Sequence, residues 1–190
     1  MSASSFAASA PTTTVSPMPV IFLGLGSNIE PEANLRLALG ELRRRFGPVV
    51  VSPVYRSAAV GFDGPEFLNL VVQLNTDETP SSVHDQLEDI HALAGRARGC
   101  EKYLSRRLDI DLLLYGEQRI DETPLQVPRK DILEYAFVLK PLSDLAPAQR
   151  HPATGKSFAE HWQAFDQAAQ PLTLCDSTFL DSRIVRTPTA

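Results

Sequence analysis

Apolar and polar residues alternate along the chain in blocks that predict strands and helices in turn. Residues 20–25 form a continuous apolar run followed by a turn signal at 26–28, which predicts a buried strand. The next apolar residues recur at helical spacing until Gly47-Pro48, and they predict a helix. These residues are Leu35, Leu39, Leu42 and Phe46.

The same alternation continues to about residue 139. Residues 49–55 and 67–75 are rich in β-branched and other apolar residues and predict two strands. We expect the loop between them, residues 56–66, to be functional or mobile. Thr79-Pro80-Ser81 predicts the start of a second helix, and a buried strand follows at 108–115. Beyond it we expect a short strand near Ile120, a loop through Pro128, a helical turn from Ile132, and a strand at 137–139 that extends the sheet.

The resulting order, βαββαβ with additions, predicts an α+β fold. We expect a ferredoxin-like α/β sandwich, in which helices pack on a sheet rich in antiparallel strands. Residues 1–18 are low in complexity and predict a disordered tail, residues 19–166 the domain, and residues 167–190 a peripheral tail.

Composition and charge reduce the number of protein classes to which the chain could belong. The chain has 190 residues, of which 43% are hydrophobic and 22% charged, as in an ordinary globular domain. A net charge of −5 argues against broad nucleic-acid binding, so a phosphate site has to be a local cationic cluster. Cys100 and Cys175 form neither a disulfide framework nor a metal motif, and no run is long enough to span a membrane. We therefore expect a cytoplasmic monomer that acts on small molecules.

Asp109 and Asp111 carry the most specific chemical signal. On a strand their spacing puts both carboxylates on one face, roughly 6–7 Å apart along the chain. Mg²⁺ is typically held by one or two carboxylates, water and substrate phosphate oxygens, which favours a magnesium site. The alternative is a pair of solvated or salt-bridged aspartates.

A cluster of cations precedes these carboxylates. It consists of Arg96, Arg98, Lys102, Arg106 and Arg107. Arginine meets phosphate oxygens with a planar fork, so the cluster favours a polyphosphate clamp over a merely solvated basic loop. Metal and arginines together are typical of phosphoryl transfer.

Other polar and aromatic residues are less specific. Phe67 and Asn69 share a strand face, where an aromatic ring and an amide could bind a heterocycle, and Phe137 carries the same ambiguity between core and site. Gly24 and Gly26 fail the dinucleotide fingerprint at Ile29, and we expect them to serve a turn. The histidines lack metal-ligand spacing, so we expect surface or cap roles for them.

Taken together, these residues resemble the 6-hydroxymethyl-7,8-dihydropterin pyrophosphokinase family, from about residue 20 to 165. The resemblance rests on the order and spacing of short motifs. They are Leu-Gly-Leu-Gly-Ser-Asn at 23–28, Val-Tyr-Arg-Ser at 54–57, Phe-Leu-Asn at 67–69, Gly-Arg-Ala-Arg at 95–98, the aspartate strand at 106–116, and Phe-Val-Leu-Lys-Pro-Leu at 137–142.

The resemblance implies an activity and its residues. The family transfers the pyrophosphate of ATP to the pterin hydroxymethyl oxygen in folate biosynthesis, releases AMP and uses two Mg²⁺ ions. It implies metal binding by Asp109 and Asp111, catalytic roles for these and for Arg96 and Arg106, and pterin binding by Ser57, Val60, Phe67, Asn69 and Phe137. Nucleotide binding is implied for Arg96, Arg98 and Arg106. We add Lys102 from the cationic cluster, and Arg129, which could supply a further cation near phosphate.

The chain departs from the family pattern mainly around the nucleotide. Tyr103-Leu104-Ser105 replaces Trp-Gly-Pro, His91 replaces a glutamate, and Arg129-Lys130 replaces His-Tyr. A divergent paralogue that binds a pterin-like ring with altered or absent ATP-dependent transfer is the main alternative. A non-enzymatic ferredoxin-like module, including an RNA-binding one, is the other, although the chain has no aromatic RNA-recognition motif.

Overall fold

A computed structural model of the chain describes residues 18–95, 107–180 and 185–186. Its centre is a seven-stranded sheet in the order β5-β1-β4-β2-β9, with β3 paired to β4 and β8 paired to β3. The strands are β1 (Val20–Ser27), β2 (Val49–Val51), β3 (Val54–Ser57), β4 (Phe67–Asn75), β5 (Asp109–Tyr115), β8 (Thr173–Cys175) and β9 (Val185–Arg186). Every described pairing in this sheet is antiparallel except β2 with β9.

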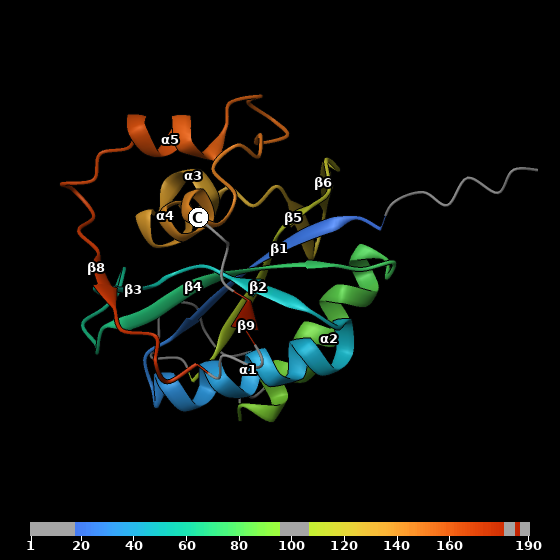
Figure 1. Cartoon of the computed structure of the whole chain (residues 1–190), viewed down its shortest axis with the longest axis horizontal. Helices are drawn as coiled ribbons and strands as arrows, with labels where there is room; N and C mark the ends of the chain where they lie inside the picture. The colour runs from blue at the N-terminus through green and yellow to red at the C-terminus, as the bar shows by residue number, and fades with distance from the viewer. Residues whose placement is uncertain (1–17, 96–106, 181–184, 187–190) are drawn as a thin grey trace, which may run out of the picture.

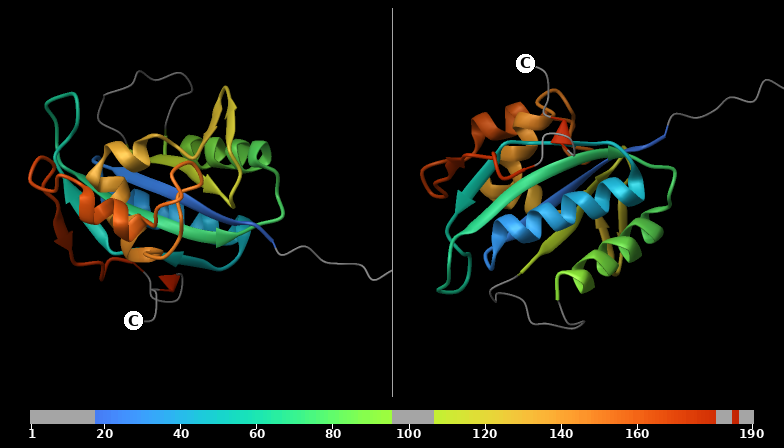
Figure 2. Two further views of the ribbon diagram at one scale, coloured as in Figure 1. Left: turned by 90° about the horizontal axis from the view of Figure 1, so that it is seen from above. Right: turned by 60° about the horizontal axis from the view of Figure 1, so that its bottom comes forward.

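Helices cover both faces of the sheet (Figures 1 and 2). The helices α1 (Pro31–Phe46) and α2 (Pro80–Leu93) lie on one face, and α3 (Asp131–Glu134), α4 (Ala136–Leu145) and α5 (Phe158–Ala164) lie on the other. A small hairpin of β6 (Ile120–Glu122) and β7 (Leu125–Val127) stands beside β5. The α+β sandwich predicted from the sequence is confirmed.

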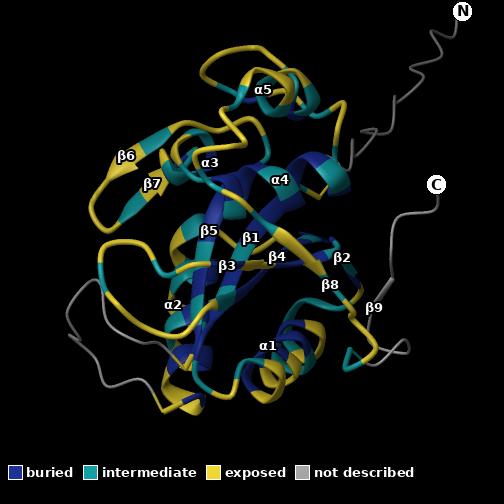
Figure 3. Ribbon diagram, turned by 90° about the vertical axis from the view of Figure 1, so that its left-hand side faces the viewer, coloured by how far each residue is buried: buried dark blue, intermediate teal, exposed yellow. Residues whose placement is uncertain are grey.

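Strand alternation divides the core into two layers. Ile21, Leu23 and Leu25 of β1 face α1 and α2, whereas Phe22 faces α4. Figure 3 shows the buried strands between the two helical layers, and the more exposed hairpin at the side. The face toward α4 also carries Gly24 and Gly26, whose missing side chains leave room for the side chains of Leu113 and Asn69.

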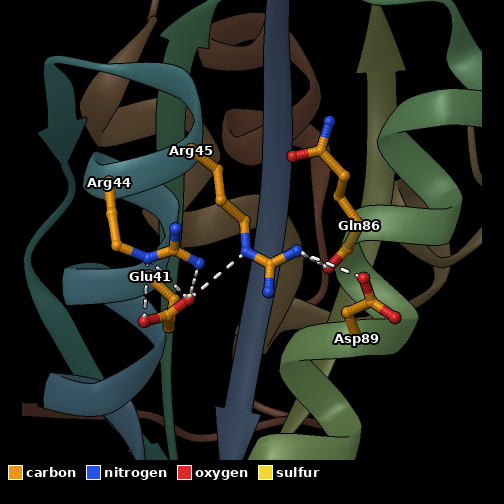
Figure 4. A network of polar contacts seen from close by, with 5 residues as sticks. All are labelled: Glu41, Arg44, Arg45, Gln86 and Asp89. Atoms are coloured by element: carbon orange, nitrogen blue, oxygen red, sulfur yellow. Dashed lines mark hydrogen bonds and ion pairs between the residues drawn. The ribbon is translucent and has the colours of Figure 1, made fainter.

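The two helices on the first face are joined by a polar network at their surface (Figure 4). Arg45 of α1 lies 3.3 Å from Glu41 and 3.4 Å from Asp89 of α2, and it also donates to the carbonyl of Gln86. Arg44 binds Glu41 at 2.7 Å, and this hydrogen bond lowers the pKa of the Glu41 carboxyl. Exposed pairs of this kind contribute roughly 0–1 kcal/mol each, so the network supports the packing of α1 on α2 without dominating it.

Several strands and helices of the structure differ in their bounds from those predicted from the sequence. The strand predicted at 49–55 is broken at Ser52-Pro53, because proline lacks a donor and Ser52 turns its own hydroxyl to the Val71 N–H at 2.9 Å. The loop predicted through Pro128 contains β7, which pairs with the expected short strand β6. The helical turn expected from Ile132 is α3.

The strand predicted at 137–139 was wrong. These residues belong to α4, which buries Val138, Leu139, Leu142 and Leu145 at helical spacing. Three apolar residues in a row fit either period, and only the longer window shows the helix. The turn predicted at Gly24 and Gly26 was also wrong, since both glycines lie inside β1.

Candidate active site

Asp109 and Asp111 lie on one face of β5, as predicted. In register, Asp109 is opposite Gly26 and Asp111 is opposite Gly24 of β1, so each carboxylate has a residue without a side chain as its neighbour on β1. Ile110 and Leu112 point the other way into the core beneath α1 and α2. Both aspartates are half-buried, and this anchored strand therefore presents two carboxylates side by side at the edge of a cavity.

Asn69 continues the same row on the next strand. Gly26 pairs with Asp109 on one side and with Asn69 of β4 on the other. The Asn69 amide is buried and donates to the Ser57 hydroxyl at 3.0 Å, with longer contacts to the carbonyls of Tyr55 and Phe67. A polar amide and a hydroxyl are thus held in place at the cavity, and both belong to residues for which the family resemblance predicts pterin binding.

Gly26 has to be small at this point. A Cβ atom added there would lie 3.2 Å from Asn69 Oδ1 and 3.7 Å from the Phe67 ring. The glycine therefore lets the Asn69 amide lie directly over the strand between the carboxylates and the aromatic residues. Glycine is required here because it has no side chain, and its conformational freedom is not needed.

Aromatic side chains border the amide. Phe67 and Phe137 both line the cavity, and Phe67 meets Phe62 edge-on, with ring centroids 6.3 Å apart. Phe137 stacks on Tyr135, with centroids 5.0 Å apart and an interplanar angle of 16°. Sequence reasoning missed Phe62 and Tyr135, because nothing in their local pattern distinguishes a cavity aromatic from a loop or cap residue.

One cavity of about 590 Å³ connects these groups. Its lining includes every described residue predicted to bind metal, pterin or nucleotide. These are Ser57, Val60, Phe67, Asn69, Asp109, Asp111, Arg129 and Phe137. Arg107 of the predicted cationic cluster does not line this cavity and instead pairs with Glu30 at 2.7 Å. The other predicted cations, Arg96, Arg98, Lys102 and Arg106, lie outside the described residues.

Arg129 lies directly against the carboxylates. Its Nη1 is 3.1 Å from Asp111 Oδ1, while its Nε and Nη2 donate to Asp131 Oδ2 at 2.8 and 2.6 Å. Burial lowers the pKa of Arg129, but the negative charges of Asp111, Asp131 and Asp109 outweigh that effect and raise it overall. Arg129 is therefore a fixed positive charge on the carboxylate side of the cavity.

A second part of the cavity runs between α2 and the hairpin. It is lined by His84, Leu87, Glu88 and His91 of α2 and by Pro124, Leu125 and Gln126. His91 is buried, and its Nε2 accepts the backbone N–H of Ile110 at 2.7 Å. The surface or cap role expected for the histidines was wrong for His91 and for His151, which is also buried.

The carboxylates of Asp109 and Asp111 suit a magnesium site shared with substrate and water better than a metal site whose ligands all come from the protein. Among residues 18–95, 107–180 and 185–186, no group of three or more His, Cys, Asp or Glu side chains could hold a metal ion by itself. Two carboxylates beside an open cavity suit Mg²⁺, which commonly completes its shell with water and substrate phosphate.

Within residues 18–95, 107–180 and 185–186, none of the helices combines the length and apolar character that a bilayer crossing requires.

Comparisons with known proteins agree with this chemistry. The sequence profile of the family described as 7,8-dihydro-6-hydroxymethylpterin-pyrophosphokinase (HPPK) matches residues 22–147. A 2-amino-4-hydroxy-6-hydroxymethyldihydropteridine pyrophosphokinase of Pseudomonas aeruginosa is 40% identical over 136 residues, which is 70% of this chain and 83% of that protein. The enzyme of the same name from Haemophilus influenzae is 31% identical over 154 residues, covering 76% of this chain and 96% of its own.

Solved structures share the fold. A crystal structure of an HPPK-DHPS protein in complex with substrates aligns with a TM-score of 0.66 at 13% identity. The alignment covers 80% of this chain and 44% of the solved one, so this chain spans less than half of that protein. At this identity the likeness concerns the fold alone.

Proposed function

Because this chain belongs to the 7,8-dihydro-6-hydroxymethylpterin-pyrophosphokinase family, we propose that it transfers the pyrophosphate group of ATP to 6-hydroxymethyl-7,8-dihydropterin. The products are AMP and the pterin diphosphate, an intermediate of folate biosynthesis. The observation that carries the proposal is the row Asp109–Gly26–Asn69 across three strands, which brings a carboxylate and a ring-binding amide into one cavity.

Asp109 and Asp111 are the proposed metal ligands. We expect them to hold two Mg²⁺ ions, which would neutralise the charge of the polyphosphate when bound. The carboxylates are suited to this task because β5 fixes their spacing and both border the cavity.

The ring-binding part of the cavity is proposed for the pterin. Asn69 offers both a donor and an acceptor for the edge of a heterocycle, and Ser57 orients that amide from β3. Phe67 and Phe137 supply apolar ring faces for stacking, and Val60, which is 43% exposed, borders the entrance from the loop before β4.

The transfer needs the pterin hydroxyl and the β-phosphorus of ATP to meet. A bond forms between the hydroxymethyl oxygen and the β-phosphorus of ATP, and the hydroxyl proton is released. The bond between the β-phosphorus and the oxygen that bridges it to the α-phosphate breaks, and AMP leaves with the bridging oxygen. Arg129 is proposed to stabilise the phosphates, together with Arg96, Arg98, Lys102 and Arg106, since such transfer depends on positioning and charge.

Product analysis tests the proposal. The purified chain is incubated with ATP, Mg²⁺ and the dihydropterin. Nucleotides and pterins are then separated by chromatography and identified and quantified by mass spectrometry. AMP and pterin diphosphate in equal amounts are expected. ADP with a pterin monophosphate, or tight pterin binding in calorimetry without any nucleotide product, would instead support the divergent paralogue.

A further inference from the structure

Arg129 is anchored so that only one edge of its guanidinium reaches Asp111. Its backbone N–H donates to the Leu113 carbonyl at 3.0 Å, which ties the residue to the end of β5. Nε and Nη2 both donate to Asp131, the first residue of α3. Nη1 is left to face Asp111 at 3.1 Å.

The two carboxylates that bind Arg129 differ in their surroundings. The side chain of Asp131 is 20% exposed and receives two donors at 2.6 and 2.8 Å, whereas that of Asp111 is 36% exposed and has the longer contact. Short, charge-assisted bonds in a less exposed place are the stronger ones. The contact with Asp131 is therefore the anchor, and the contact with Asp111 is the one that can be exchanged.

We propose that Arg129 is an exchangeable counter-ion of Asp111, which a divalent cation replaces when it binds and which then turns its Nη1 to the phosphates of the nucleotide. The inference rests on the proposed function, because it takes Asp111 as a metal ligand. It concerns this chain in particular, since the family pattern that the sequence resembles has a histidine at this position.

The exchange links metal binding to nucleotide binding. A cation arriving alone has to displace Nη1 from Asp111 and leaves that donor without an acceptor. A cation arriving with a polyphosphate brings a new acceptor for the same donor. Arg129 is thus expected to weaken binding of the metal alone and to strengthen its binding with nucleotide, which is positive coupling between the two ligands.

Binding of Mn²⁺ to the intact chain tests the exchange without any turnover. The affinity is measured by calorimetry for the wild type, for Arg129→Gln, for Asp111→Asn and for the control Arg44→Gln, with and without the α,β-methylene analogue of ATP. The control removes the same charge from an exposed pair on α1 that is not part of the cavity. Circular dichroism checks that each variant keeps its fold.

Without nucleotide, Arg129→Gln should bind Mn²⁺ about three- to fivefold more tightly than the wild type, the scale of a half-exposed ion pair, and Arg44→Gln should not. The gain in Mn²⁺ affinity on adding the analogue should be smaller in Arg129→Gln. Equal or weaker binding of Mn²⁺ alone by Arg129→Gln overturns the exchange. If Asp111→Asn binds Mn²⁺ as the wild type does, the metal assignment of the proposed function falls as well.

Discussion

His91 Nε2 accepts the backbone N–H of Ile110 at 2.7 Å, between the two aspartates of β5. This N–H points away from β1 at the edge of the sheet, where no strand pairs with it among the described residues. His91 Nδ1 lies 3.0 Å from Glu88 Oε1, which fixes the tautomer with the proton on Nδ1. The histidine therefore holds the strand segment that carries both carboxylates.

Replacing His91 should loosen that segment. His91→Ala leaves the Ile110 N–H without its acceptor and is expected to lower the free energy of unfolding by about 1–3 kcal/mol. Turnover should fall with little change in pterin affinity, because the carboxylates and not Asn69 are displaced. Urea unfolding and steady-state kinetics measure both effects.

His91→Gln provides the control for this change, since its amide oxygen can accept the same N–H. It should recover much of the stability and turnover lost in His91→Ala. An alanine variant as stable and active as the wild type would show that the imidazole does not support β5.

Gly26 should tolerate no side chain without loss of pterin binding. The Cβ of Gly26→Ala would lie 3.2 Å from Asn69 Oδ1 and force the amide to move. Crowding of this kind costs about 1–3 kcal/mol, so we expect the dissociation constant of the pterin to rise about fivefold or more in fluorescence titration.

Gly40→Ala is the matched control for Gly26→Ala. Gly40 lies within α1, and a Cβ atom added there meets no heavy atom within 4 Å. This variant should keep its pterin affinity and gain about 0.5–1 kcal/mol in stability, because alanine favours the helix. Equal pterin affinities in the two variants would contradict the role given to Gly26.

Tyr55 should stabilise the packing of β3 against α4, two elements that each supply residues to the cavity. Its hydroxyl donates to Asp144 Oδ2 at 2.5 Å and so ties β3, which carries Ser57, to the helix that carries Phe137. Burial and then the Asp144 carboxylate raise the pKa of Tyr55, so the hydroxyl keeps its proton to more alkaline pH than an ordinary tyrosine. Tyr55→Phe is expected to cost about 1.5–3 kcal/mol in thermal or urea unfolding, and an unchanged midpoint would argue against the link.

The pH dependence of stability should reflect two histidines near α5. Burial, followed by the charges of His161 and Arg119, lowers the pKa of His151, and burial also lowers the pKa of His161. A histidine with a lowered pKa binds protons more readily when unfolded, so its contribution is complete above the ordinary pKa of about 6.5 and is lost as the pH falls below it.

Thermal unfolding between pH 8 and pH 5 tests this expectation. The midpoint should hold above about pH 6.5 and drop below it. His151→Asn, whose amide oxygen could still accept the Ala153 N–H that now binds Nδ1, should flatten the profile. A variant profile parallel to that of the wild type would contradict the assignment.

The fold and the shared face of the two aspartates could be predicted from the sequence because both follow from local periodicity, whereas Ser57 was assigned to the site only from the family resemblance. The spacing of Asp109 and Asp111 predicts a shared face on any strand, and the helical stripes of α1 and α2 predict the layer beneath it. What could not be predicted depends on packing between distant segments. His91 meets Ile110, and Arg129 meets Asp111, only because α2 and the segment between β7 and α3 fold back along the edge strand.

The outcome for Phe137 shows the same limit. Its role as a cavity residue was predicted from family resemblance, whereas its secondary structure was predicted wrongly from three apolar neighbours. The stacking on Tyr135 arises from the turn between α3 and α4, which no period in the sequence describes.

Magnesium-dependent formation of AMP by carboxylate variants tests the central claim most directly. Initial rates are compared for the wild type, Asp109→Asn, Asp111→Asn and the control Asp85→Asn, an exposed aspartate of α2 outside the cavity. We predict a loss of about a hundredfold or more in each site variant and none in the control, because the asparagines keep the shape of the strand and remove its charge. Wild-type rates of AMP formation in folded Asp109→Asn and Asp111→Asn would contradict the account.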